Sequence, residues 1–295
     1  MSEQKSFDIR YLPLRISLVS LKQAELPCYL GSTLRGVIGQ ALYKEDRKAY
    51  DFLYANGKYC DGKQDIVKPY LIVPPEAFGT KTIIEQGEQL KFEFILLGNA
   101  VKYAPSLSRA LQDIWRFGLG AQRYPFSLSQ INNSQDQRVL WRKENYYATG
   151  ANAVSIPYQK LQKVTGVVIK LCTPLRIRRS GQLLTSITFP TLIRNITNRI
   201  IAITERYGGF VNKEEATRLL MLAAEVRTTK EDLRLEQVER YSNRLKGKMD
   251  LSGLLGELEF AGDLTPFVPW LLAAQILHIG RNTTFGMGRI EVYFI

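Results

Sequence analysis

The sequence is short of the residues that staple small secreted proteins or hold metal ions. Its 295 residues include three cysteines and one histidine. The cysteines, Cys28, Cys60 and Cys172, stand far apart and form no C-x-x-C pair. A disulfide framework is therefore not indicated, and a zinc site would lack ligands at the usual spacing. We expect no metal site and no cofactor, and this cysteine usage is typical of a protein of the reducing cytoplasm.

Long hydrophobic runs are also missing. No run of about 18 apolar residues occurs, and the start of the chain, MSEQKSFDIRYL, has no signal-peptide core. We therefore expect a protein that neither spans a membrane nor is secreted. With 45% hydrophobic residues, the chain is too apolar to be a disordered basic tail. Its length suits one large domain or two of about 150 residues.

Acidic residues are the scarcer charge, because 28 of them face 40 lysines and arginines, which gives a formal net charge of +12. Residues 160–209 contain nine basic residues and one acidic residue, Glu205, a net charge of +8. A second basic cluster lies at 240–250, where only Asp250 is acidic: Arg240, Arg244, Lys246 and Lys248. Such clustering among polar residues is typical of a surface that binds a phosphate backbone. The alternative is a solvated face that keeps the protein soluble.

Hydrophobic patterning indicates that one order of elements occurs twice. In the first half, alternating or short apolar runs predict strands at 11–20, 69–73 and 90–97, with another short strand after Gly120. Helical spacing predicts helices at 30–54 and around 107–115. In the second half, strands are predicted at 164–172, 236–241, 254–260 and 289–295, and helices at 189–207 and 265–279.

This repeated β-α-β-β-α-β order predicts an α+β fold of two tandem ferredoxin-like domains, an architecture that RNA-recognition modules also use. A polar, turn-rich stretch between the halves indicates a linker. We expect an N-terminal ferredoxin-like domain at 1–135, a linker at 136–162, and a C-terminal ferredoxin-like domain with a glycine-rich loop at 163–295.

Four short motifs lie in order along the second half: TPLRIRRSGQ (173–182), RYSNRLKGKMDLSG (240–253), GLLGELEFAGDLTPFVPWLLAAQ (253–275) and LHIGRNTTFGMGRIEVYF (277–294). Two weaker ones, GSTLRGVIGQAL (31–42) and KPYLIVPP (68–75), lie in the first half. In these motifs and their order, the chain resembles the CRISPR-associated repeat-processing endoribonucleases of the RAMP superfamily.

The resemblance implies that the protein binds the repeat segment of a CRISPR precursor transcript and cuts it to release guide RNAs. It also implies a metal-independent reaction, in which the 2′-hydroxyl attacks the adjacent phosphate and leaves a 2′,3′-cyclic phosphate and a 5′-hydroxyl. The sequence has no H-x-x-E or D-x-D cluster, which agrees with that route. Repeat RNA is the implied partner, with effector-complex subunits or a second copy of the chain as further partners.

The C-terminal loop supplies the first candidate RNA contacts: Gly280, Arg281, Thr283, Gly286, Gly288 and Arg289. Glycines carry no Cβ, so backbone N–H groups beside them can approach a phosphate closely, and the arginines can add charge-assisted contacts. The alternative is a tight turn whose glycines serve the backbone conformation only.

Further candidate RNA contacts are basic residues outside that loop: Arg35, Arg176, Arg178, Arg179, Arg199, Lys246 and Lys248. Guanidinium groups suit phosphates well and also stack on bases. Because alternate residues of an extended segment share a face, we expect Arg176 and Arg178 to point together.

Two alternatives remain for the catalytic residues. His278 is the only histidine, and its unperturbed pKa suits acid–base catalysis near neutrality. A histidine near a helix C-terminus also suits a structural role. Relatives in the family place the catalytic histidine on or near the first helix, where this sequence has none. That helix offers Tyr43, Lys44 and Lys48 instead, a phenol to relay a proton and cations to stabilise the phosphorane.

The missing first-half histidine leaves room for a different function. The chain would then be a non-catalytic RNA-binding subunit of a CRISPR guide-RNA complex. A general RNA-binding protein outside CRISPR is the third hypothesis.

Overall fold

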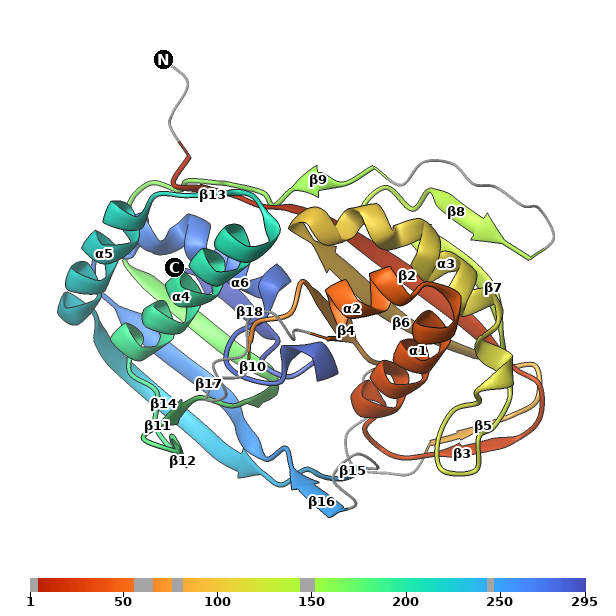
Figure 1. Cartoon of the computed structure of the whole chain (residues 1–295). Helices are drawn as coiled ribbons and strands as arrows, with labels where there is room; N and C mark the ends of the chain where they lie inside the picture. Colours follow the sequence, from red (N-terminus) through yellow and green to blue (C-terminus); the bar gives the residue numbers. More distant parts are fainter. Residues whose placement is uncertain (1–4, 56–65, 76–81, 144–151, 243–246) are drawn as a thin grey trace. The chain divides into compact units, whose positions relative to one another are not determined.

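Figure 1 shows the computed structural model of the chain, in which residues 5–55, 66–75, 82–143, 152–242 and 247–295 are described. The chain forms two compact units. One unit is Arg10–Val154, and the other combines the N-terminal segment through Ile9 with Ser155–Ile295. The stretch 136–162, expected as a linker, contains β8 (Val139–Arg142) and β9 (Val154–Ser155), and the chain passes from one unit to the other within β9.

The unit Arg10–Val154 is built on an antiparallel sheet with the strand order β4-β6-β2-β7-β8. Besides β8, its strands are β2 (Arg10–Ser20), β4 (Tyr70–Val73), β6 (Gln89–Leu97) and β7 (Phe126–Asn133). The helix α1 (Gly31–Glu45) lies between β2 and β4 in the chain, and α3 (Ala104–Gln112) lies between β6 and β7. Both helices cover the same face of the sheet (Figure 1) and share one hydrophobic core with it.

Alternation along β2 determines which face of this sheet is buried. Leu12, Leu14, Ile16 and Leu18 are 2% exposed or less and lie in the core beneath α1 and α3. Pro13 does not interrupt the strand. Its carbonyl accepts a hydrogen bond from Ser134 N–H (2.9 Å), just beyond the end of β7. The nitrogen and the carbonyl of a strand residue point to the same side, so the proline nitrogen lies beyond the end of β7, where the sheet needs no N–H donor.

The unit that contains Ser155–Ile295 has a sheet with the order β14-β17-β10-β18. Its strands are β10 (Gly166–Leu175), β14 (Arg227–Glu236), β17 (Gly253–Ala261) and β18 (Ile290–Phe294). The helix α4 (Phe189–Tyr207) follows β10, and α6 (Val268–Leu277) follows β17. The N-terminal β1 (Phe7–Asp8) pairs with β13 (Phe210–Val211), and the Phe7 ring meets Trp270 of α6 edge to face, with 5.0 Å between the ring centroids.

Both units have the same topology. If the four main strands of each are numbered along the chain, their spatial order is 2-3-1-4 in both sheets. One helix follows the first strand and another follows the third, which is the ferredoxin-like β-α-β-β-α-β arrangement. The predicted tandem of ferredoxin-like domains is confirmed.

Short elements join these main ones. Two-stranded pairs form between β3 (Ala24–Leu26) and β5 (Thr82–Ile84), β11 (Arg178–Arg179) and β12 (Gln182–Leu183), and β15 (Glu239–Ser242) and β16 (Gly247–Asp250). Two further helices are α2 (Arg47–Leu53) after α1 and α5 (Lys213–Leu222) after α4.

The strand β14 differs from the sequence prediction, which placed a strand at 236–241. Its residues, RTTKEDLRLE, have no apolar alternation, and almost all of their side chains are exposed. The strand is held by backbone pairing with β17 from Arg227 opposite Ala261 to Glu236 opposite Gly253. Hydrophobic periodicity cannot reveal a strand that buries neither face.

The helix predicted at 30–54 is two helices, with Asp46 between them. Asp46 is extended (φ −148°, ψ 99°), and its side chain accepts hydrogen bonds from Ala49 N–H (3.0 Å) and Ser106 Oγ–H (2.6 Å). It therefore caps α2 and ties the break to α3. These hydrogen bonds fix how the last turn of α1 is placed relative to the first turn of α2.

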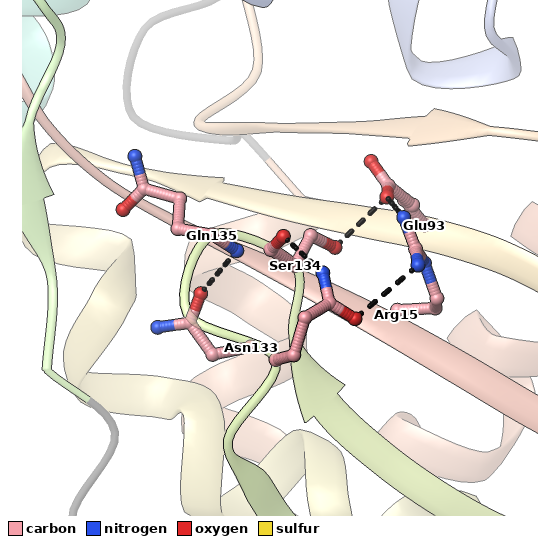
Figure 2. A network of polar contacts seen from close by, with 6 residues as sticks. Arg15, Glu93, Asn133, Ser134 and Gln135 are labelled. Atoms are coloured by element: carbon pink, nitrogen blue, oxygen red, sulfur yellow. Dashed lines mark hydrogen bonds and ion pairs between the residues drawn. The ribbon is translucent and has the colours of Figure 1, made fainter.

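Polar side chains cross-link β2, β6 and the turn after β7 (Figure 2). Arg15 of β2 pairs with Glu93 of β6 (3.2 Å), and Glu93 also accepts a hydrogen bond from Ser134 Oγ–H (2.8 Å). Asn133 Oδ1 accepts a hydrogen bond from Gln135 N–H (2.9 Å). The network holds the turn that leads into β8 against the sheet.

The cap at Asp46 predicts a stability effect. Asp46→Ala removes both hydrogen bonds and should lower the free energy of unfolding by about 1–2 kcal/mol. Urea unfolding of this variant measures the change. Asp51→Ala, which removes only an exposed ion pair with Arg47 from α2, is the control and should cost less than about 0.5 kcal/mol. Equal losses in the two variants would contradict the capping role.

Candidate functional site

The connection after β10 carries the exposed arginines of the basic stretch. Arg178 and Arg179 form β11 and pair with Leu183 and Gln182 in a tight hairpin. Ser180 and Gly181 at its turn both have positive φ (51° and 82°), as a two-residue hairpin turn requires. Both arginine side chains are exposed. This hairpin therefore presents two guanidinium groups to solvent on a fixed backbone.

Arg176 has a different environment from Arg178, so the expectation that the two share a face is wrong. Arg176 is 3% exposed, because β10 ends at Leu175 and the arginine turns inward. Its guanidinium donates to the carbonyl of Ser252 and to Asp250 Oδ2 (3.4 Å). These contacts join the end of β10 to the start of β17, which makes Arg176 a structural tie.

Arg281 lies near this tie. Its backbone N–H donates to the carbonyl of Arg176 (2.8 Å). Burial lowers the pKa of Arg176 and Asp250 opposes this effect, while the positive charges of Arg178 and Arg281 lower that pKa further. The three arginines are thus neighbours in one basic region of this unit.

The glycine-rich loop after α6 packs its backbone against the end of β10. A Cβ on Gly280 would lie 2.6 Å from the carbonyl oxygen of Arg176, and one on Gly288 would lie 1.8 Å from that of Ile279. Both glycines also have positive φ (75° and 72°). Only glycine fits this close approach.

Several amides of the loop are bonded within the protein. Gly288 N–H donates to the carbonyl of Pro174 (3.1 Å) and Gly286 N–H to that of Thr283 (2.9 Å). The hydroxyl of Thr173 donates to the carbonyl of Gly286 (2.8 Å) and accepts from Arg289 N–H (2.9 Å). Thr283 is itself 5% exposed. This geometry favours the alternative in which the glycines serve the backbone conformation.

His278 lies at the end of α6, inside the protein. Its residue is 2% exposed and has a positive φ (54°). Nδ1 lies 3.2 Å from the carbonyl oxygen of Met287, a bond in which the ring nitrogen donates, and Ile279 N–H donates to the carbonyl of Gly288 (2.9 Å). Burial and the neighbouring charge of Arg199 lower the pKa of His278 to about 3. The neutral ring of His278, at the start of the loop, therefore holds Met287 near its end by a hydrogen bond.

Arg199 of α4 is also buried. Its Nε donates to the carbonyl of Leu277 at the end of α6 (2.7 Å), and burial lowers its pKa to about 10. A guanidinium at a helix C-terminus stabilises the carbonyls that lack partners there. Arg199 thus joins α4 to α6, and its side chain has no path to an RNA phosphate at the surface.

On the first helix, the predicted catalytic residues are exposed. Tyr43 is 50% exposed, and Lys44 and Lys48 are exposed beside it on the last turn of α1 and the first turn of α2. The Arg47 guanidinium lies 4.1 Å from the centroid of the Tyr43 ring, and the ring of Tyr50 meets that of Tyr43 edge to face at 5.0 Å. Arg47 is thus the cation that contacts the phenol, while it also pairs with Asp51 (3.0 Å), and Lys44 and Lys48 are exposed on the same stretch of chain.

Sequence reasoning missed Arg47 and Tyr50. The signal was their spacing from Tyr43, four and seven residues on, which puts all three on one face even though the helix breaks at Asp46. Arg35 lies on another part of α1, half-buried, with its guanidinium 5.2 Å from the ring of Tyr54.

Three candidate RNA-binding residues remain: Arg289, Lys246 and Lys248. Arg289 pairs with Glu291 (3.8 Å). Lys246 lies outside the described residues, as does the side chain of Lys248. In the described part of the chain, no three His, Cys, Asp or Glu side chains form a group that could hold a metal ion. No helix in the same part is long and apolar enough to cross a membrane.

Comparison with known proteins places the fold and the C-terminal region. Residues 169–290 match the family model described as CRISPR-associated endoribonuclease Cas6, and a model described as an N-terminal domain matches residues 9–153. No curated protein matches the chain.

Solved structures share the whole fold. A Cas6 product complex is 16% identical, with 96% of this chain and 100% of that chain covered and a TM-score of 0.62. A Thermus thermophilus Cas6 is 15% identical (97% and 99% covered, TM-score 0.60). A chain of a partial Cas6-RT-Cas1–Cas2 complex is 14% identical (99% and 47% covered, TM-score 0.62).

The topology and these neighbours place the chain in the class of tandem ferredoxin-like proteins. Within that class, residues 169–290 match the model of the CRISPR-associated endoribonuclease Cas6 family, and the resemblance carried by the sequence motifs is confirmed.

The burial of His278 predicts a pH-dependent stability. Its pKa is about 3 in the folded chain and about 6.5 in the unfolded chain, so below about pH 6.5 only the unfolded state binds the proton. The free energy of unfolding should therefore fall by about 1.4 kcal/mol between about pH 7.5 and about pH 5.5.

Urea unfolding of the wild type and of His278→Gln at these two pH values measures the effect. No other histidine contributes, because the sequence has one. The variant should lose this pH dependence, and a variant that keeps it would show that His278 is not buried and neutral.

Proposed function

We propose that the chain is a repeat-specific endoribonuclease that binds CRISPR repeat RNA and cuts the precursor transcript into guide RNAs. The match of residues 169–290 to the Cas6 family carries this proposal. The exposed pair Arg178 and Arg179 supports it, because these side chains offer charge to a phosphate backbone. We propose effector-complex subunits as further partners, since a structural neighbour is part of a Cas6-RT-Cas1–Cas2 complex.

We propose that the cut needs no metal ion. The 2′-hydroxyl of the RNA attacks the adjacent phosphorus, the bond to the 5′-oxygen breaks, and the products carry a 2′,3′-cyclic phosphate and a 5′-hydroxyl. The protein must align the attack, offset the charge of the phosphorane and supply a proton to the leaving oxygen.

We assign these tasks to the surface around Tyr43. As the 2′-hydroxyl attacks, its proton passes to solvent water. The Tyr43 hydroxyl donates a proton to the leaving 5′-oxygen and regains one from water, and exposed cations on the same stretch of chain offset the phosphorane charge: Lys44, Arg47 and Lys48. The exposure of Tyr43 and the 4.1 Å separation between Arg47 and its ring support this assignment. His278 holds the glycine-rich loop and moves no proton, since its ring is buried and its pKa is about 3.

The same histidine supports a second candidate function. Because the only imidazole of the chain is buried and neutral, none is available at an RNA-binding surface. A non-catalytic RNA-binding subunit of a CRISPR guide-RNA complex would need none.

Single-turnover cleavage of the cognate repeat RNA in the presence of EDTA tests the reaction. A discrete product that carries a cyclic phosphate is expected, since neither the attack nor the proton transfer uses a metal. Binding without cleavage would favour the RNA-binding subunit.

The same assay tests the residues. Tyr43→Phe should slow cleavage about a hundredfold, the usual contribution of a positioned acid, and Lys44→Ala or Lys48→Ala should also slow it. Tyr293→Phe, which removes a phenol of similar exposure (53%) from β18, is the control and should cut at the wild-type rate. If Tyr43→Phe and the lysine variants also cut at that rate, the assigned site is wrong.

The β11–β12 hairpin predicts an effect on affinity. The double variant Arg178→Ala/Arg179→Ala should weaken binding of repeat RNA and reduce the slope of log K against log salt by about 1.4–1.8, because two phosphate contacts are lost. Arg227→Ala/Arg234→Ala removes the same charge from β14, where both arginines are exposed, and should change the slope little. Equal changes in both double variants would show that only the total charge matters.

A further inference from the structure

The segment between α3 and β7 carries an exposed tryptophan on a fixed backbone. It consists of the 3-10 helix Ile114–Arg116 and a turn that Leu119 and Tyr124 close. The side chain of Trp115 is 47% exposed, whereas Ile114 and Leu119 are fully buried. The two buried residues anchor the segment in the core of its unit and leave the indole ring in solvent.

Backbone contacts hold the turn in one conformation. Leu119 and Tyr124 exchange two backbone hydrogen bonds (2.8 and 2.9 Å). Gly118 has a positive φ (65°), and a Cβ there would lie 2.2 Å from the carbonyl oxygen of Arg123. A ligand that binds here meets side chains on an ordered segment, so it loses little free energy to the ordering of a loop.

Cations lie among the rings of this surface. The Arg116 guanidinium lies 5.3 Å from the Trp115 ring, and Lys22 Nζ lies 5.5 Å from the ring of Tyr124. Arg123 is exposed on the turn itself. Asp113 pairs with Arg116 (3.3 Å), whereas no ion pair of Lys22 or Arg123 occurs among the described residues. The local charge is therefore positive.

The topologically equivalent segment of the other unit is different. There, the connection from α6 to β18 is the glycine-rich loop, and its large side chains, Phe285 and Met287, are 7% and 0% exposed. The same place in the duplicated fold thus buries its apolar side chains in one unit and exposes a tryptophan in the other. The fold itself does not require the exposure of Trp115.

We propose that this surface, formed by Lys22, Trp115, Arg116, Arg123 and Tyr124, binds a single-stranded segment of RNA. A base stacks on the Trp115 ring, and the adjoining phosphates lie near Arg123 and Lys22. Rings interleaved with cations are the chemistry by which proteins bind unpaired nucleotides without strict sequence preference. The inference rests on the proposed function for the source of the RNA, a single-stranded part of the precursor transcript.

Binding of a labelled oligouridine of about ten nucleotides, followed by fluorescence anisotropy at several salt concentrations, tests the proposal. Trp115→Ala/Arg123→Ala should raise Kd about tenfold or more and reduce the salt slope by about 0.7, the value for one phosphate contact on a single strand. Trp115→Phe, which keeps a ring for stacking, should stay within about threefold of the wild type.

The matched control is Lys213→Ala/Met221→Ala on α5, which also removes one cation and one exposed large side chain (Met221, 65% exposed). It should bind like the wild type. A Kd and slope of Trp115→Ala/Arg123→Ala within about twofold of the wild type would overturn the proposal. Equal weakening by the control would overturn it too, as would a wild type that does not bind the oligouridine.

The readout is affinity and does not depend on cleavage. If the wild type binds the oligouridine through this surface but cuts no repeat RNA, the proposed nuclease fails and the single-strand site stands. If the wild type cuts repeat RNA but the double variant binds oligouridine as tightly as the wild type, the proposed nuclease stands and the single-strand site fails. Thermal unfolding of each variant checks that the exposed substitutions leave the fold intact.

Discussion

The second unit depends on the close approach of two backbone segments, the loop after α6 and the end of β10. Arg281 N–H and Gly288 N–H bond to the carbonyls of Arg176 and Pro174, and the glycines at 280 and 288 leave no Cβ to separate the chains. This contact sets where β18 begins and encloses His278 beneath the loop. It also fixes the base of the β11–β12 hairpin, because Arg176 is held at both its backbone and its side chain.

The arginines of this unit divide into two groups with different physical roles. Removing a guanidinium from water is costly unless oxygen atoms replace the lost hydration. Arg176 and Arg199 meet that condition in part, with the carbonyls of Ser252 and Leu277, so they act as internal struts. Among the described residues, Nε of Arg176 and Nη2 of Arg199 are buried without a hydrogen-bond partner. Arg178 and Arg179 keep their hydration and remain available to an anion. The net charge of the chain is therefore larger than the charge that a polyanion meets, since the buried arginines have a structural role.

The two units share a topology but use equivalent places differently. In the C-terminal unit, the connection between the second helix and the fourth strand is closed against the sheet and holds a neutral histidine. In the N-terminal unit, the same connection presents Trp115 and Arg123 to solvent. The surface around Tyr43 also belongs to the N-terminal unit. There, Asp46 separates α1 from α2, and the end of α1 and the start of α2 contribute to one surface. The two units thus have the same topology, and their side chains give the equivalent connections different properties.

The sequence by itself determined the order of elements and the family. Alternation along β2 and the apolar stripe of α4 depend on neighbours a few residues apart, so they can be read directly, and α4 has the predicted bounds of 189–207. The helix break at Asp46 was not predicted from hydrophobic spacing. Asp46 caps α2 through the nearby Ala49 N–H, and a hydrogen bond from Ser106, sixty residues away, also holds its side chain. Only the tertiary structure separated Arg176 from Arg178 and enclosed His278, since burial is decided by segments distant in the chain. A residue type indicates what a side chain is able to do, and its exposure decides whether a substrate reaches it.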